Sequence, residues 1–375
     1  MMGYLVVKAS TASMVISTLI SFLLLVGLPS SQARHDHQEP PAIFIFGDGA
    51  LDVGNNNYLE PRYYRDPMRA DHRYYGIDSP DSKPTGRFSN GYNIADFIAK
   101  TMDFEMSPPP YLSLTSPIKD FTGANYASEG AGIWNITNEY GVTIHLLEQV
   151  DYFANTSARM MSQLGEHELR KLISKSLFLV SIGTIDLFRI FSFVSYGRES
   201  TEEGHADVQN LITSFGVGIT ALHNMGARKF GIINIPPLGC TPAGMQVIHF
   251  GPGGCDDNFN MFVREFNDGL KPLMAGLASK LDGLHYSIAD SYNFSNATFQ
   301  NPSASGFVNT DLACCKGPCD ARFEQYVGPP CQNRTEYWMW DNVHTTEQAA
   351  KLSAAAFYDG TAQFTTPVNF KKLVQ

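Results

Sequence analysis

The sequence has no apolar run of membrane-spanning length and no cluster of basic residues. Its longest apolar run, residues 14–28, has 15 residues, whereas a transmembrane helix needs about 20. Lys8 is the single charged residue among the first 33, so of 27 basic and 37 acidic residues the rest of the chain keeps 26 and 37, a net charge of about −11. These absences argue against a transmembrane anchor, and against nucleic acid or an anionic membrane surface as the partner.

The short apolar run is typical of a secretory signal peptide, which we expect at residues 1–33. Lys8 supplies the positive start, and small residues precede a cleavage site after Ala33. The sequence also lacks an internal repeat and a low-complexity linker, so we expect residues 34–375 to form a single domain. We therefore expect the mature protein outside the cell or in the lumen of the secretory pathway.

The densest group of cysteines, residues 314–319, contains no histidine. That absence disfavours zinc, and we expect no metal or other cofactor. An even number of six cysteines in an exported chain indicates disulfides. We expect Cys240 to pair with Cys255, and we leave the pairing of the other four open. Export is also consistent with five N-glycosylation sequons, which begin at Asn135, Asn155, Asn293, Asn296 and Asn333.

Short apolar segments alternate with amphipathic ones along the chain. The expected strands are residues 42–46, 123–128, 176–182, 228–234 and 284–290, and the main expected helices are 93–100, 144–173, 208–225, 258–281 and 346–358. Residues 58–81 lack helical periodicity, and we interpret them as a surface loop. The alternation predicts an α/β fold with a doubly wound parallel sheet of about five strands. The turns that follow these strands would then meet along one edge of the sheet.

The turn after the first expected strand carries the motif on which the functional prediction depends. It reads GDGALDVGNN at residues 47–56. This string closely resembles the first signature block of the plant GDSL esterase/lipases, within the SGNH hydrolase superfamily. In that block the third residue is the nucleophilic serine, and here Gly49 stands in its place.

Further strings match the same family in the correct order. The string PTGRFSNG at residues 84–91 is intact, although Arg87 taken alone is equally compatible with a plain surface residue. The turn at 129–132 matches the block that gives a backbone N–H to the oxyanion hole, from either Gly130 or Gly132. The turn at 183–186 matches the family's Gly-x-Asn-Asp, except that Ile185 replaces the asparagine whose side chain donates to the oxyanion.

The last matching string is Asp-x-x-His, formed by Asp341 and His344. In the family the histidine is the general base, and the aspartate orients its ring and stabilises its charged form. An Asp-x-x-His pair is common by chance, but its place just before the last long helix agrees with the family.

The resemblance implies the SGNH hydrolase fold, a flavodoxin-like three-layer α/β/α sandwich, and a location in the apoplast or cell wall. It implies an acyl ester or lipid as the ligand class. Because Gly49 replaces the nucleophile and Ile185 replaces an oxyanion donor, we expect a catalytically inactive or strongly impaired protein with a binding or scaffold role, for such a ligand or for a protein partner. The alternative is a carboxylic-ester hydrolase acting on lipid or acylated cell-wall substrates, for example through water activated by His344.

Overall fold

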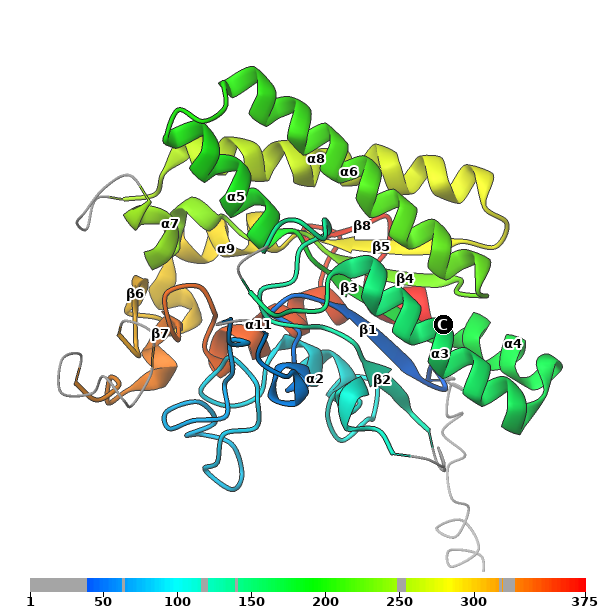
Figure 1. The fold of residues 1–375 in the computed structure, drawn as a ribbon. Coiled ribbons are helices and arrows are strands. Elements are labelled where there is room, and N and C mark those ends of the chain that lie inside the picture. Colours follow the sequence, from blue (N-terminus) through cyan, green and yellow to red (C-terminus); the bar gives the residue numbers. More distant parts are fainter. Residues whose placement is uncertain are drawn as a thin grey trace, which may run out of the picture. The chain divides into compact units, whose positions relative to one another are not determined.

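A six-stranded sheet in the order β2-β1-β3-β4-β5-β8 organises the structure (Figure 1). The computed structural model describes residues 39–62, 65–115, 121–138, 141–247, 254–316, 319 and 328–375, and the expected signal peptide lies outside them. Strands β1 to β5 are parallel, and β8 pairs antiparallel with β5. The strands of this sheet are β1 (Ile43–Gly47), β2 (Gly123–Asn125), β3 (Leu177–Ser181), β4 (Lys229–Ile233), β5 (His285–Ala289) and β8 (Thr365–Thr366).

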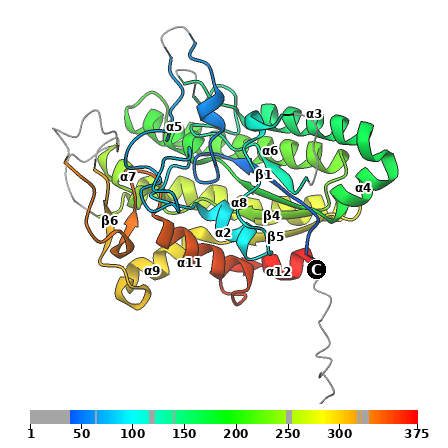
Figure 2. The same ribbon diagram turned by 90° about the horizontal axis from the view of Figure 1, so that it is seen from below.

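Helices cover both faces of the sheet (Figure 2). On one face they are α3 (Leu146–Leu164), α4 (Glu166–Lys175), α5 (Thr184–Ser195), α6 (Thr201–Asn224) and α8 (Asp257–Lys280), and on the other α2 (Ile94–Lys100), α11 (Glu347–Tyr358) and α12 (Phe370–Val374). The remaining helices are α7 (Pro242–Gln246), α9 (Ser291–Gln300) and the short 3-10 turns Asn55–Tyr58, Tyr111–Ser113, Leu238–Cys240, Pro302–Ser305 and Arg334–Glu336.

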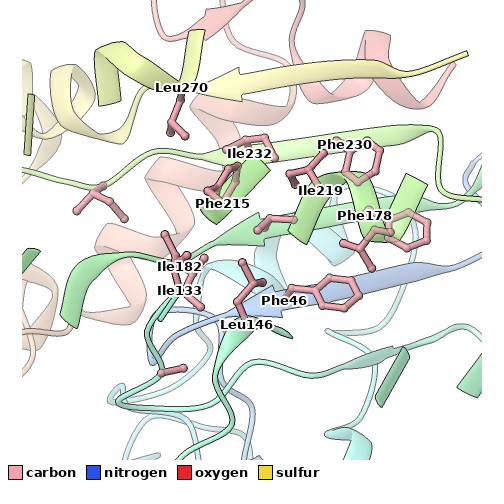
Figure 3. Close-up of a cluster of buried hydrophobic side chains, with 14 of the residues drawn as sticks. Phe46, Ile133, Leu146, Phe178, Ile182, Phe215, Ile219, Phe230, Ile232 and Leu270 are labelled. Carbon is pink, nitrogen blue, oxygen red and sulfur yellow. The ribbon is translucent and has the colours of Figure 1, made fainter. Parts of the chain in front are cut away.

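The central strands supply side chains to a hydrophobic core on each face of the sheet, because successive side chains of a strand point to opposite faces. In β1, Phe44 and Phe46 belong to the core beneath α3, α6 and α8, whereas Ile43 and Ile45 belong to the core beneath α2 and α11. Figure 3 shows the first of these cores, in which Phe46 and Phe178 lie among helical side chains such as Leu146 and Phe215. All four β1 residues are fully buried.

The observed architecture confirms the predicted α/β sandwich, including all five expected strands. The order 2-1-3-4-5 of the parallel strands is the flavodoxin-like order. The sequence reading missed the short edge strand β8 and a second, two-stranded sheet made of β6 (Asn309–Ala313) and β7 (Tyr337–Met339). It also placed the start of α6 too late, because a capping box between Ser200 and Glu203 extends this helix to Thr201.

The interpretation of residues 58–81 as a surface loop was wrong for its second half. The segment is irregular, but Tyr74 and Tyr75 are only 5% exposed. They pack in a small core together with Trp340 and the Cys314–Cys331 disulfide. Aromatic residues in a loop without periodicity can thus supply core packing, which a search for helical spacing does not detect.

The expected disulfide between Cys240 and Cys255 is confirmed. The four cysteines whose pairing the sequence left open form the disulfides Cys314–Cys331 and Cys315–Cys319, and the described residues contain no free cysteine.

Within the described part of the chain, no helix is long and apolar enough to cross a membrane. The same residues contain no group of three or more histidine, cysteine or acidic side chains that could hold a metal ion.

The C-terminal residues complete the far edge of the sheet. Thr365 and Thr366 of β8 pair with Ala289 and Ile288 of β5. Beyond them α12 buries Phe370 beneath the sheet, and the Lys229 ammonium donates a hydrogen bond to the Val374 carbonyl at 2.6 Å. The last eleven residues therefore belong to the folded unit that spans residues 39–375.

Candidate active site

The turns that follow β1, β2 and β3 meet at one edge of the sheet, as the parallel arrangement predicts. They bring Gly49, Glu129 and Ile185 to the wall of a cavity of about 80 Å³, whose other side is formed by His344. The remaining wall includes the apolar side chains of Phe88 and Leu238. Segments separated by nearly 300 residues thus form a single small site.

Side chains of the first motif fix the geometry between two of these turns. The buried Asp52 carboxylate accepts hydrogen bonds from the backbone N–H groups of Gly54, Asn55 and Glu129, at 2.7, 2.9 and 3.0 Å. The Asn56 amide donates to the carbonyl oxygen of Glu129 at 3.0 Å. These contacts hold the turn after β2 against the turn after β1, so the intact part of the motif serves as scaffold.

Arg87 is buried, which excludes its interpretation as a plain surface residue. Its Nε and Nη2 atoms each donate to the fully buried Asp96 carboxylate at 2.7 Å. Asp96 also closes a capping box with Asn93 at the start of α2, and the Asn93 amide donates to the carbonyl oxygen of Asp52 at 2.9 Å. The string at residues 84–91 therefore supports the turn after β1 through α2.

The hydrogen-bonded pair expected of Asp341 and His344 is present. Nδ1 of His344 lies 2.9 Å from Oδ2 and 3.0 Å from Oδ1 of Asp341. The Asp341 carboxylate also accepts the backbone N–H of Val343 and the Tyr75 hydroxyl, both at 2.9 Å. Tyr75 was not anticipated, since it lies in the segment interpreted as a surface loop.

The other ring nitrogen of His344 faces Glu129, a residue for which the sequence predicted no role. Nε2 lies 3.0 Å from Oε2 of Glu129, and the side chains of the two residues are only 12% and 8% exposed. A Cβ atom built on Gly49 would overlap Oε2 of Glu129 and would lie 2.5 Å from Nε2 of His344. The glutamate carboxylate therefore occupies the space beside the histidine that the side chain of residue 49 would enter. An acidic residue among small ones, between Ser128 and Gly130, was the available signal.

The two glycines considered as oxyanion donors lie away from the cavity wall. The structure describes both, but Glu129 lines the cavity at this turn and neither Gly130 nor Gly132 does. Gly130 has φ +78° and contacts Asn138, and Gly132 packs against Thr137 and Asp186. Ile185 does line the cavity, with an apolar side chain at the position for which the resemblance predicts an amide donor. The catalytic roles of all these positions stay predictions.

Comparisons with known proteins identify the family of the chain. Residues 43–357 match the family described as GDSL-like lipase/acylhydrolase. The chain belongs to this family. It is 33% identical over 346 residues to the GDSL esterase/lipase At5g55050 of Arabidopsis thaliana, covering 89% of this chain and 90% of the relative. It is 31% identical over 361 residues to the GDSL esterase/lipase APG of the same plant, covering 92% and 96%. The crystal structure of the lipase Lip_vut3 from a goat rumen metagenome shares 9% identity at a TM-score of 0.36, covering 84% of this chain and 94% of that one.

Charges in the GDSL-family site favour a protonated histidine. Burial alone would lower the pKa of His344, but the carboxylates of Asp341 and Glu129 outweigh it and hold this pKa well above its usual value of 6.5. Burial opposes the charge of Asp341 as well, yet the contacts with His344 keep the pKa of Asp341 below its usual value. Burial raises the pKa of the neighbouring Asp48 to about 6, and the charge of Glu129 adds to this shift. An imidazolium between two carboxylates is the expected state at neutral pH.

Replacing Glu129 with glutamine should lower the pKa of His344, because the amide carries no charge. We expect the wild-type ring to be protonated at pH 7, measured from the ring ¹⁵N shifts as a function of pH. Since the folded-state pKa lies above the unfolded value, the charged ring stabilises the fold below about pH 6.5, and this contribution is lost as the pH rises through the folded-state pKa.

A matched control is Glu265→Gln, whose carboxylate faces His205 at 2.5 Å, far from β1 in the chain. This change should leave the titration of His344 unaltered. A wild-type His344 pKa at or below 6.5 would contradict the assignment.

Proposed function

We propose that this member of the GDSL family binds its ligand or partner without hydrolysing esters. The observation that carries the proposal is the pairing of His344 with Glu129 above a glycine. A serine hydrolase needs a hydroxyl that its histidine can deprotonate. Here residue 49 has no side chain, and the histidine nitrogen that would take the proton is engaged by a carboxylate.

Other hydroxyl groups in the cavity do not replace the missing nucleophile. Ser89, Ser181 and Thr184 line the wall, but Nε2 of His344 is hydrogen bonded to Glu129 rather than to any of them. A general base must lie within about 2.6–3.2 Å of the proton that it removes. The arrangement thus supports a binding role for these side chains.

The charges of the site also disfavour hydrolysis by activated water. A protonated His344 cannot accept a proton from water. The tetrahedral oxyanion would form beside Glu129, which is negatively charged, and beside Ile185, which has no hydrogen-bond donor in its side chain. Burial, together with the charge of Glu129, raises the pKa of Asp48 to about 6, and the same two effects would oppose a further negative charge in the cavity. Both catalytic routes therefore lack a component.

The decisive measurement is made on the purified wild-type protein. We expect no labelling by a fluorophosphonate probe, and hydrolysis of nitrophenyl acetate and butyrate at the background rate. The variant His344→Ala should give the same background, because the histidine performs no catalysis. Robust wild-type turnover that disappears in His344→Ala would overturn the proposal and favour the alternative, an ester hydrolase with an unusual nucleophile.

The expected binding or scaffold role is proposed for the same cavity edge, with an acyl ester, a lipid or a protein as the partner class. Export, glycosylation and a location in the apoplast or cell wall are part of this proposal. Among the five sequon asparagines, Asn135, Asn155, Asn293 and Asn333 are exposed, so glycans could be attached to them without disturbing the core.

A further inference from the structure

The space beside Gly49 is occupied by a neighbouring side chain, and the backbone conformation at this residue does not call for glycine. Its φ lies outside the left-handed range that favours glycine. A Cβ atom at this residue would instead overlap Oε2 of Glu129 and approach Nε2 of His344. Any other residue at position 49 must therefore displace the carboxylate. The glycine and the glutamate thus fit each other in volume.

The turn holds the Glu129 carboxylate in place from both sides of its backbone. The N–H of Glu129 donates to Asp52 at 3.0 Å, and its carbonyl oxygen accepts from the Asn56 amide and the Thr143 hydroxyl, each at 3.0 Å. The side chain is 8% exposed and ends on His344. Because the backbone of Glu129 is fixed and its side chain is buried, the contact between Glu129 and His344 is part of the folded structure. Glu129 is not a surface side chain that happens to lie over a cavity.

We propose that the site is a carboxylate-binding site filled by the protein's own Glu129. Nε2 of His344 lies 3.0 Å from the glutamate oxygen, the distance at which a protonated ring would hold the carboxylate of a small ligand. The matching ligand class is a short free carboxylic acid in its anionic form. The inference rests on the proposed function in one respect, that residue 49 carries no nucleophile.

An internal group on a rigid turn competes strongly with a free ligand, because its effective concentration is at least millimolar. Native Glu129 therefore closes the site to small carboxylates. Removal of the glutamate side chain should open it, since the space beside Gly49 is vacated and the His344 ring keeps its contact with Asp341. The scaffold contacts of Glu129 use only backbone atoms and persist when the side chain is shortened.

The test compares wild-type protein with Glu129→Ala in titrations with sodium butyrate, read from the ring signals of His344 and from calorimetry. We expect saturable binding to Glu129→Ala at least tenfold tighter than to the wild type, and no binding of uncharged butyramide. Glu265→Ala is the control, because it removes a carboxylate from the side of His205 and should bind butyrate as weakly as the wild type. Equal binding by wild type and Glu129→Ala, or binding of butyramide, would overturn the proposal.

A second variant keeps the proposal testable if Glu129→Ala does not fold. Gly49→Ala leaves the glutamate but forces its carboxylate away from His344, so the pKa of His344 should fall as it does in Glu129→Gln. An unchanged titration in Gly49→Ala would contradict the proposal. Failure of the proposed function is distinguishable, since it would appear as wild-type ester turnover and would not alter the butyrate result.

Discussion

Combining Gly49→Ser with Glu129→Ala and Ile185→Asn should raise ester hydrolysis above that of Gly49→Ser by about 10² or more. The single change supplies a hydroxyl, but its Cβ atom meets the Glu129 carboxylate, which holds the histidine that must deprotonate it. The second change frees His344, and the third restores a side-chain donor, which is worth roughly 10²–10³ in turnover. A nucleophile contributes about 10⁶ only where the other groups are in place, so the three changes should be strongly non-additive.

The readouts are nitrophenyl butyrate hydrolysis and fluorophosphonate labelling of the introduced serine. Gly49→Ser with Ile185→Asn, which keeps Glu129, should exceed Gly49→Ser alone but remain below the triple variant. Adding His344→Ala to the triple variant should return activity to background. If the triple variant folds, retains the Asp341–His344 contact and is still no more active than Gly49→Ser, then Glu129 is not the obstacle that we infer.

Asp96→Ala should lower the free energy of unfolding by about 3–5 kcal/mol, the usual result of leaving a buried charge unpaired. Asp96 is fully buried and receives two hydrogen bonds from Arg87. It also accepts the backbone N–H groups of Asn93 and Ser107, at 3.0 and 3.1 Å. Removal of the carboxylate therefore leaves a guanidinium and two backbone donors without this partner.

Urea unfolding, followed by circular dichroism, measures this loss. The control is Glu166→Ala at the exposed Glu166–Arg170 pair, whose side chains are 63% and 76% exposed. Exposed pairs of this kind contribute about 0.3–0.5 kcal/mol, so the control should unfold nearly as the wild type does. A loss below about 1 kcal/mol for Asp96→Ala would show that water reaches the guanidinium in the variant.

The sheet could be predicted from the sequence because each of its central strands is short, apolar and followed by a turn. The apolar run ending at Gly47 is an example, since its alternate residues fill both cores. The strand β8 could not be recognised, because two threonine residues carry no periodicity and pair only after the rest of the sheet exists. The start of α6 was placed too far along the chain for a different reason. The first turns of this helix are polar, so apolar periodicity does not reveal the capping box at its start.

For the site, the sequence predicted which catalytic groups are absent, but not which side chain lies beside His344. The motif spacing places Gly49, Ile185, Asp341 and His344 at one edge, and the structure brings these residues together. That Glu129 reaches His344 depends on the distance between two segments that are 215 residues apart in the chain. Tyr75 escaped prediction for the same reason, because its hydroxyl meets Asp341 through tertiary packing alone.

The pairing of β8 with β5 also constrains the order in which the chain can fold during synthesis. A ribosome delivers residues from the N-terminus, so β1 to β5 emerge well before Thr365 and Thr366. Until these last residues appear, the outer edge of β5 presents unpaired N–H and C=O groups, which in general invite pairing with other chains. The final eleven residues thus close the nascent sheet against association, and a chain truncated before residue 365 would carry that open edge permanently.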